Sequence, residues 1–95
     1  MELSEEHQKE LSDAYDRLEN SQSLLTINRL LSRAMEIAKL YSKIGEENTL
    51  VDALEQVKRK HFIPAEAETN RVKKETLVKV AVSNLRAVLF RFISK

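Results

Sequence analysis

Hydrophobic residues recur every three to four positions along most of the chain, which is the spacing of one face of an α-helix. Near the N-terminus, Leu11, Tyr15 and Leu18 form a narrow apolar stripe with charged residues on either side. From Leu24 to Ile44 the apolar positions cover more than half of the helix circumference, which is typical of a helix at the centre of a bundle. The pattern predicts an all-α fold.

Capping residues indicate where several of these helices begin and end. Ser4 stands before two glutamates and is a typical N-cap, because its hydroxyl can accept a free backbone N–H while the acids favour the positive end of the helix. Gly45 is expected to end the second helix, since glycine enters the left-handed C-cap conformation without a Cβ penalty. Asn48 or Thr49 is expected to cap the third.

Two further boundaries depend on local chemistry. The polar cluster from Asn20 to Ser23 predicts a short turn, although a continuous helix also fits it. Pro64 disfavours helical geometry at Ile63 and suits the first turn of a helix, so the third helix is expected to end before it and the last to begin with it. We therefore predict one domain, residues 1–95, built as a small four-helix bundle with helices at roughly 5–21, 24–44, 49–61 and 65–93.

The last segment also contains a strand-like stretch. Residues 76–82 read TLVKVAV, and the β-branched side chains in it suit a strand. The helical spacing of Leu77, Ala81 and Leu85 favours a helix instead, and the chain offers no second strand to pair with it.

Composition narrows the class of protein. One glycine and one proline allow few tight turns, and the absence of cysteine excludes disulfides, thiolate metal sites and a cysteine nucleophile. The N-terminus has no basic segment followed by an apolar run, and no apolar stretch is long enough to cross a membrane. We expect a soluble, cytoplasmic protein. A domain this small has modest stability, so completion of the bundle by homodimerisation is also expected.

Charge is segregated along the chain. Residues 1–20 hold seven acids and two bases, a balance of −5, whereas residues 71–95 hold seven bases and one acid, a balance of +6. These opposite fields would place the first helix beside the last, within one bundle or between two copies. The alternative is a partner that carries the opposite charge.

No catalytic or metal-binding motif is present. The two histidines, His7 and His61, stand outside any ligand spacing, and a single glycine excludes phosphate-binding glycine loops. The nearest approach to a catalytic group is His61 with Glu66 and Glu68 around Pro64, for which an exposed loop is the simpler interpretation. We expect no enzyme activity, no metal and no cofactor.

The last helix has more apolar side chains than one seam can bury. Contiguous exposed apolar area on a small domain usually marks an interaction surface. A central, fully covered helix is the alternative explanation. The sequence thus favours a non-enzymatic protein-interaction module, an adaptor, inhibitor or assembly subunit, that binds a protein partner or itself through Val82, Leu89, Phe90 and Ile93.

Nucleic-acid binding is the second hypothesis. Phosphate contacts would come from Lys58, Arg59 and Lys60 and from the basic last helix, with the candidate cations Lys73, Lys74, Arg86 and Arg91. A sequence pI of about 8.0 and the lack of an aromatic stacking platform weigh against it. A membrane surface is a poorer match than a protein interface for so apolar a helix.

The stretch from Leu30 to Leu54, LLSRAMEIAKLYSKIGEENTLVDAL, resembles the small four-helix immunity proteins of bacteriocin producers. It has an apolar helix, a glycine-containing break and a capped third helix in the order of that family, over about a quarter of the chain. The resemblance implies a helical bundle that blocks a toxin or receptor by surface contact. It assigns no role to any single residue.

Overall fold

The computed structural model describes residues 3–20, 23–41 and 49–93, and these form an all-α fold without a strand. Two helices open the chain, α1 (Glu5–Asn20) and α2 (Leu24–Leu40). The helix α3 (Thr49–Val57), the π-helical segment η1 (Lys58–Phe62) and α4 (Ile63–Ala67) follow one another without a gap and make one rod. The last helix is α5 (Arg71–Ile93). The predicted small helical bundle is confirmed.

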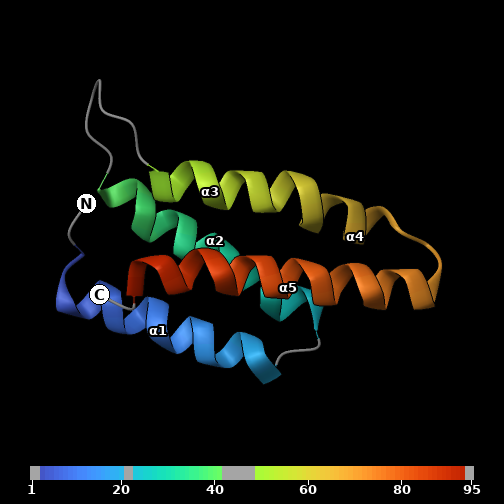
Figure 1. The fold of residues 1–95 in the computed structure, drawn as a ribbon, viewed down its shortest axis with the longest axis horizontal. Coiled ribbons are helices and arrows are strands. Elements are labelled where there is room, and N and C mark those ends of the chain that lie inside the picture. The colour runs from blue at the N-terminus through green and yellow to red at the C-terminus, as the bar shows by residue number, and fades with distance from the viewer. Residues whose placement is uncertain (1–2, 21–22, 42–48, 94–95) are drawn as a thin grey trace.

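The long helix α5 lies between α1 on one side and the rod of α3, η1 and α4 on the other, while α2 crosses behind it (Figure 1). The acidic first helix and the basic last helix therefore pack side by side within one chain. They run antiparallel, because Gln8 near the start of α1 donates a hydrogen bond of 3.2 Å to the carbonyl oxygen of Ile93 at the end of α5.

One apolar core holds the bundle together. Every helical segment contributes to it, and among the described residues no polar or charged residue is buried. The π-helical segment contributes Phe62, the largest side chain of the core. The other buried side chains are Leu11, Ala14, Leu18, Ile27, Leu31, Ala34, Ile37, Ala38, Leu50, Leu54, Val57, Ala65, Ala81, Leu85, Val88 and Leu89.

The starts of α1 and α2 agree with the capping residues in the sequence. Ser4 caps α1, because its Oγ accepts the backbone N–H of His7 at 3.3 Å and its carbonyl accepts that of Gln8 at 2.9 Å. Ser23 has extended backbone angles at the start of α2, so the first two helices are separate. Helix α2 ends at Leu40, four residues before the predicted end at 44. Gly45 and Asn48 lie outside the described residues, and Thr49, the other candidate cap of the third helix, is the first residue of α3.

The predicted boundary at Pro64 is wrong. Ile63 is helical, with φ −62° and ψ −47°, and the rod continues to Ala67. The N–H of Ile63 bonds to the carbonyl of Lys58, five residues back instead of four. This wider π turn relieves the clash that the Pro64 ring would otherwise make with the carbonyl four residues before it, so the proline is tolerated inside the rod.

The true break lies at residues 68–70, after α4 ends at Ala67, and Asn70 caps the helix that follows. Its Oδ1 accepts the backbone N–H groups of Val72 and Lys73, both at 3.1 Å, which is the geometry of an N-cap. From there α5 is helical through the strand-like stretch 76–82. Thr76 and Asn84 also bond back to the carbonyls four residues earlier, at 3.2 and 2.8 Å. None of the described helices is long and apolar enough to span a bilayer.

Candidate protein-binding groove

A groove of about 730 Å³ runs along α5 where this helix meets the end of α1 and the start of α2. Its α5 side chains recur at alternating steps of three and one, so that every second one is four residues on, and they form one stripe of the helix. The apolar members form the floor, of which Leu18 is buried and Leu24, Val78 and Val82 are half-buried. The polar members form the rim: Glu19, Arg71, Lys74, Glu75, Lys79, Ser83 and Arg86.

The rim carries an excess of positive charge, with four bases and two acids. Each acid already has a basic partner in the groove. Arg71 pairs with Glu75 at 3.7 Å, and Arg86 pairs with Glu19 at 3.7 Å. Lys74 and Lys79 form no ion pair within the described part of the chain, so two cations of the rim remain available to an anionic partner.

Arg86 is held in place at the α1 side of the groove. Its guanidinium carbon lies 4.2 Å from the centre of the Tyr15 ring, and its Nε donates to the carbonyl oxygen of Tyr15 at 3.3 Å. The Tyr15 ring in turn packs against Phe90, with 5.9 Å between ring centres. These contacts fix one wall of the groove because they join α1 to α5.

Of the four apolar interface candidates, only Val82 lines the groove. Leu89 belongs to the core, with 1% of its surface exposed, so its assignment to an interaction surface is corrected. Its position on α5 faces the other helices, which a count of apolar residues around one helix does not reveal. Ile93 is half-buried against the core, and Phe90 is 52% exposed beside Tyr15.

The basic candidates are divided between separate parts of the surface. Lys74 and Arg86 belong to the rim of the groove, whereas Lys73 is exposed outside it. Arg91 lies near the end of α5, 5.8 Å from the centre of the Phe92 ring. The run Lys58, Arg59 and Lys60 is exposed on η1, which does not line the groove.

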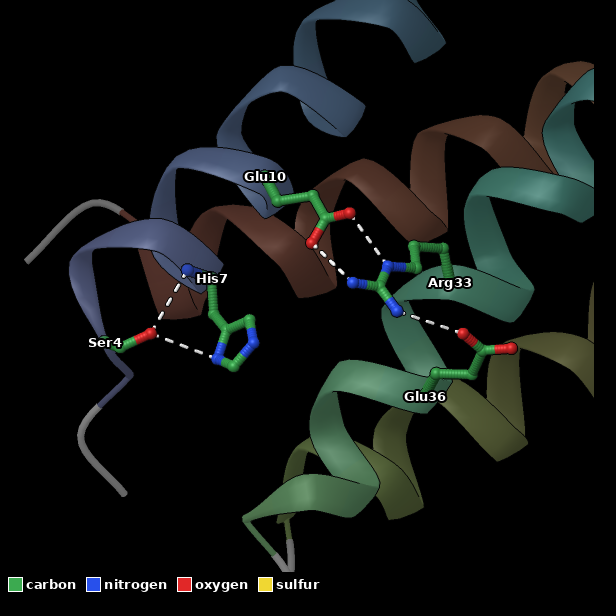
Figure 2. A network of polar contacts seen from close by, with 5 residues as sticks. All are labelled: Ser4, His7, Glu10, Arg33 and Glu36. Atoms are coloured by element: carbon green, nitrogen blue, oxygen red, sulfur yellow. Dashed lines mark hydrogen bonds and ion pairs between the residues drawn. The ribbon is translucent and has the colours of Figure 1, made fainter.

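A second groove, of about 560 Å³, lies between α1 and α2 and carries balanced charge, with three acids and three bases in its lining. Across it, Arg33 donates from Nε to Glu10 Oε1 at 2.8 Å and from Nη2 to Glu10 Oε2 at 3.1 Å (Figure 2). A further bond of 3.1 Å joins Arg33 to Glu36. The bonds from Arg33 lower the pKa of Glu10, and those to both glutamates raise the pKa of Arg33. These contacts clamp α1 to α2.

His7 joins the start of α1 to the end of α2. Its Nδ1 lies 3.1 Å from Ser4 Oγ and also shares a hydrogen bond with the Tyr41 hydroxyl (Figure 2 shows Ser4 and His7). The same hydroxyl accepts the backbone N–H of Ser4 at 2.9 Å. The sequence gives no signal for this cluster, because Tyr41 is more than thirty residues from Ser4 and His7. Its contacts are those of a structural tie.

The carboxylates near Pro64 also have structural partners. Glu66 accepts a bond of 2.7 Å from Asn28 on α2, and Glu68 accepts the backbone N–H of Asn70 at 3.0 Å. Among residues 3–20, 23–41 and 49–93, no three histidine, aspartate or glutamate side chains are gathered as a metal site would require. The groove along α5 is therefore the strongest candidate site.

Comparison of the chain with protein-family models, with curated proteins and with solved structures finds no match. The resemblance of residues 30–54 to bacteriocin immunity proteins receives no support from these comparisons. What the groove does must therefore be inferred from its own residues.

Proposed function

We propose that the chain is a non-enzymatic protein-interaction module that binds its partner in the groove between α1, α2 and α5. The observation that carries the proposal is the combination of an apolar floor with a basic rim on α5. Val78 and Val82 lie one helical turn apart on the floor, and Lys74 and Lys79 flank them. Adaptor, inhibitor and assembly subunit are all roles that such a surface can serve.

The groove suits a peptide helix better than a small molecule. An apolar groove recognises an amphipathic helix by contacting apolar side chains one turn apart along it. Val78 and Val82 on the floor have this spacing. The lining of the groove mixes apolar and charged side chains. Such surfaces match the composition of protein interfaces, with an apolar centre and a polar rim.

Nucleic-acid binding stays the alternative, and the exposed run Lys58 to Lys60 on η1 favours it. The groove itself is poorly suited to nucleic acid. Glu19 and Glu75 on its rim would repel phosphate groups, and its lining contains no aromatic side chain on which a base could stack. The two hypotheses therefore place the contact on different elements, α5 with α1 and α2 for a protein and η1 for a nucleic acid.

Site-specific photo-crosslinking tests the proposal. A benzophenone amino acid is placed at Ser83 on the rim of the groove, and a matched control carries it at Ser32, an exposed serine of α2 outside the groove. Irradiation in extract of the native cells should give discrete, nuclease-resistant protein adducts from the Ser83 position alone, identified by mass spectrometry. Adducts that nuclease removes, or equal adducts from both positions, would contradict the proposal.

A further inference from the structure

We infer that the occupant of the groove is an acidic amphipathic helix supplied by a different protein. The inference rests on the proposed function and adds the chemistry of the partner. Lys74 and Lys79 lack an ion-pair partner among the described residues, and they flank the half-buried apolar pair Val78 and Val82. A helix with a leucine stripe bordered by glutamates would complement both features at once.

The length of the groove matches a short helix. Its stripe on α5 runs from Arg71 to Arg86, a span of about 22 Å at 1.5 Å per residue. A partner helix of about 14 residues, or four turns, covers this distance. Apolar side chains of the partner helix, spaced one turn apart, would contact the floor. Its acidic side chains, also one turn apart, would reach the cations of the rim.

The rim contains both fixed and exchangeable cations. Arg86 is held by Tyr15, so its position is set before a partner arrives. The Arg71–Glu75 pair is different, because it spans 3.7 Å with side chains that are 93% and 64% exposed. Exposed pairs of this kind contribute little, so Arg71 can turn to an acid of the partner at small cost.

A second copy of the chain fits less well than another protein. The acidic helix of this chain is α1, but its apolar residues Leu11, Ala14 and Leu18 are buried in the core and cannot reach another groove. Placing α1 of one copy in the groove of the next would also join two different surfaces, and such contacts form open chains of molecules unless a ring closes.

Peptide binding to the full-length chain tests the inference. The probe is a fluorescent peptide of about 14 residues with leucines at helical spacing and glutamates elsewhere, and its two controls carry lysine or glutamine in place of glutamate. Fluorescence anisotropy should give an affinity for the glutamate peptide at least about tenfold above that for the lysine peptide, and it should fall as salt is added.

Two charge-reversal variants locate the contact. K74E/K79E reverses the free cations of the groove, and K58E/K60E reverses two exposed lysines of η1 with the same change in net charge. The first should weaken binding of the glutamate peptide by about tenfold or more, whereas the second should change it less than about twofold. Circular dichroism checks that each variant is folded. K74Q/K79Q removes the two charges of the groove without reversing them and should weaken binding less than K74E/K79E.

Equal binding of the glutamate and lysine peptides would overturn the inference, and so would equal losses in the two variants. Displacement of the peptide by an oligonucleotide at lower concentration than by unlabelled peptide would assign the groove to nucleic acid instead. If photo-crosslinking at Ser83 still yields protein adducts while no acidic preference is found, the proposed function stands and only the chemistry of the partner is wrong.

Discussion

Arg86 of α5 stacks on Tyr15 of α1, with its guanidinium carbon 4.2 Å from the ring centre, and donates to the carbonyl oxygen of the same tyrosine. The residues are 71 positions apart in the sequence. The contact joins the first helix to the last and orients a cation at the edge of the groove. It therefore links the stability of the bundle to the shape of the proposed binding surface.

Loss of the Arg86 contacts should destabilise the fold. Arg86→Met keeps an apolar stem but removes the stacking charge, the hydrogen bond and the ion pair with Glu19, and we expect a loss of about 1–2 kcal/mol in the free energy of unfolding. Urea denaturation followed by circular dichroism measures it. Lys79→Met is the matched control on the same helix and should change stability by less than about 0.5 kcal/mol. Equal effects would contradict the role assigned to Arg86.

Neighbouring residues of α5 should respond very differently to a buried charge. Leu89→Asp places a carboxylate in the core and should cost about 3 kcal/mol or more, enough to unfold much of a small domain. Phe90→Asp changes a side chain that is 52% exposed and should leave the chain helical. Light scattering on Phe90→Asp also tests self-association, because any dimer formed through this residue becomes a monomer. A helical Leu89→Asp variant would show that the core is assigned wrongly.

The N-cap of α5 offers a second measure of local stability. Asn70→Ala removes the side chain that accepts the N–H groups of Val72 and Lys73, and it should cost about 1 kcal/mol. Asn70→Asp keeps the acceptor and should keep most of the stability. Thr69→Ala, in the same exposed turn, is the control. Thermal unfolding ranks the three variants, and an Asn70→Ala protein as stable as the Thr69→Ala protein would refute the cap.

The clamp between α1 and α2 should depend on pH. Hydrogen bonding from Arg33 lowers the pKa of Glu10 in the folded state below the ordinary value of 4.5. The stabilisation is therefore fully present above pH 4.5 and is lost as the pH falls through the lowered value. The difference in unfolding free energy between the natural chain and Glu10→Gln should shrink over that range. In an Arg33→Gln background the pH dependence of this difference should disappear.

Sequence pattern was sufficient for the helical class, and the segregated charge favoured the pairing of α1 with α5, but only the structure shows that this pairing lies within one chain. Helical spacing of apolar residues identified the helical segments, but it did not identify the rod as continuous past Pro64. Pro64 was misplaced because the single-residue slip of the π turn, which lets the proline stay inside the rod, leaves no mark in the sequence. Asn70, three residues past the end of α4, carries the cap instead.

The groove was only partly predictable. Val82, Lys74 and Arg86 were candidates from the sequence, but the sequence does not show that Leu18 and Leu24 complete the floor, since they come from other helices. Leu89 was misassigned because the apolar face of α5 is buried on two sides, by α1 and by the rod of α3, η1 and α4. Which side of an apolar helix is covered depends on the packing of its neighbours.

Amide-resolved nuclear magnetic resonance of the isotope-labelled chain, titrated with the leucine–glutamate peptide, tests the central claim most directly. If the peptide binds in the groove, the largest shifts fall on Leu24, Val78, Val82 and Ser83, with little change on η1. Shifts centred on Lys58 to Lys60, or spread evenly over the basic surface, would contradict the assignment of the groove as the binding site.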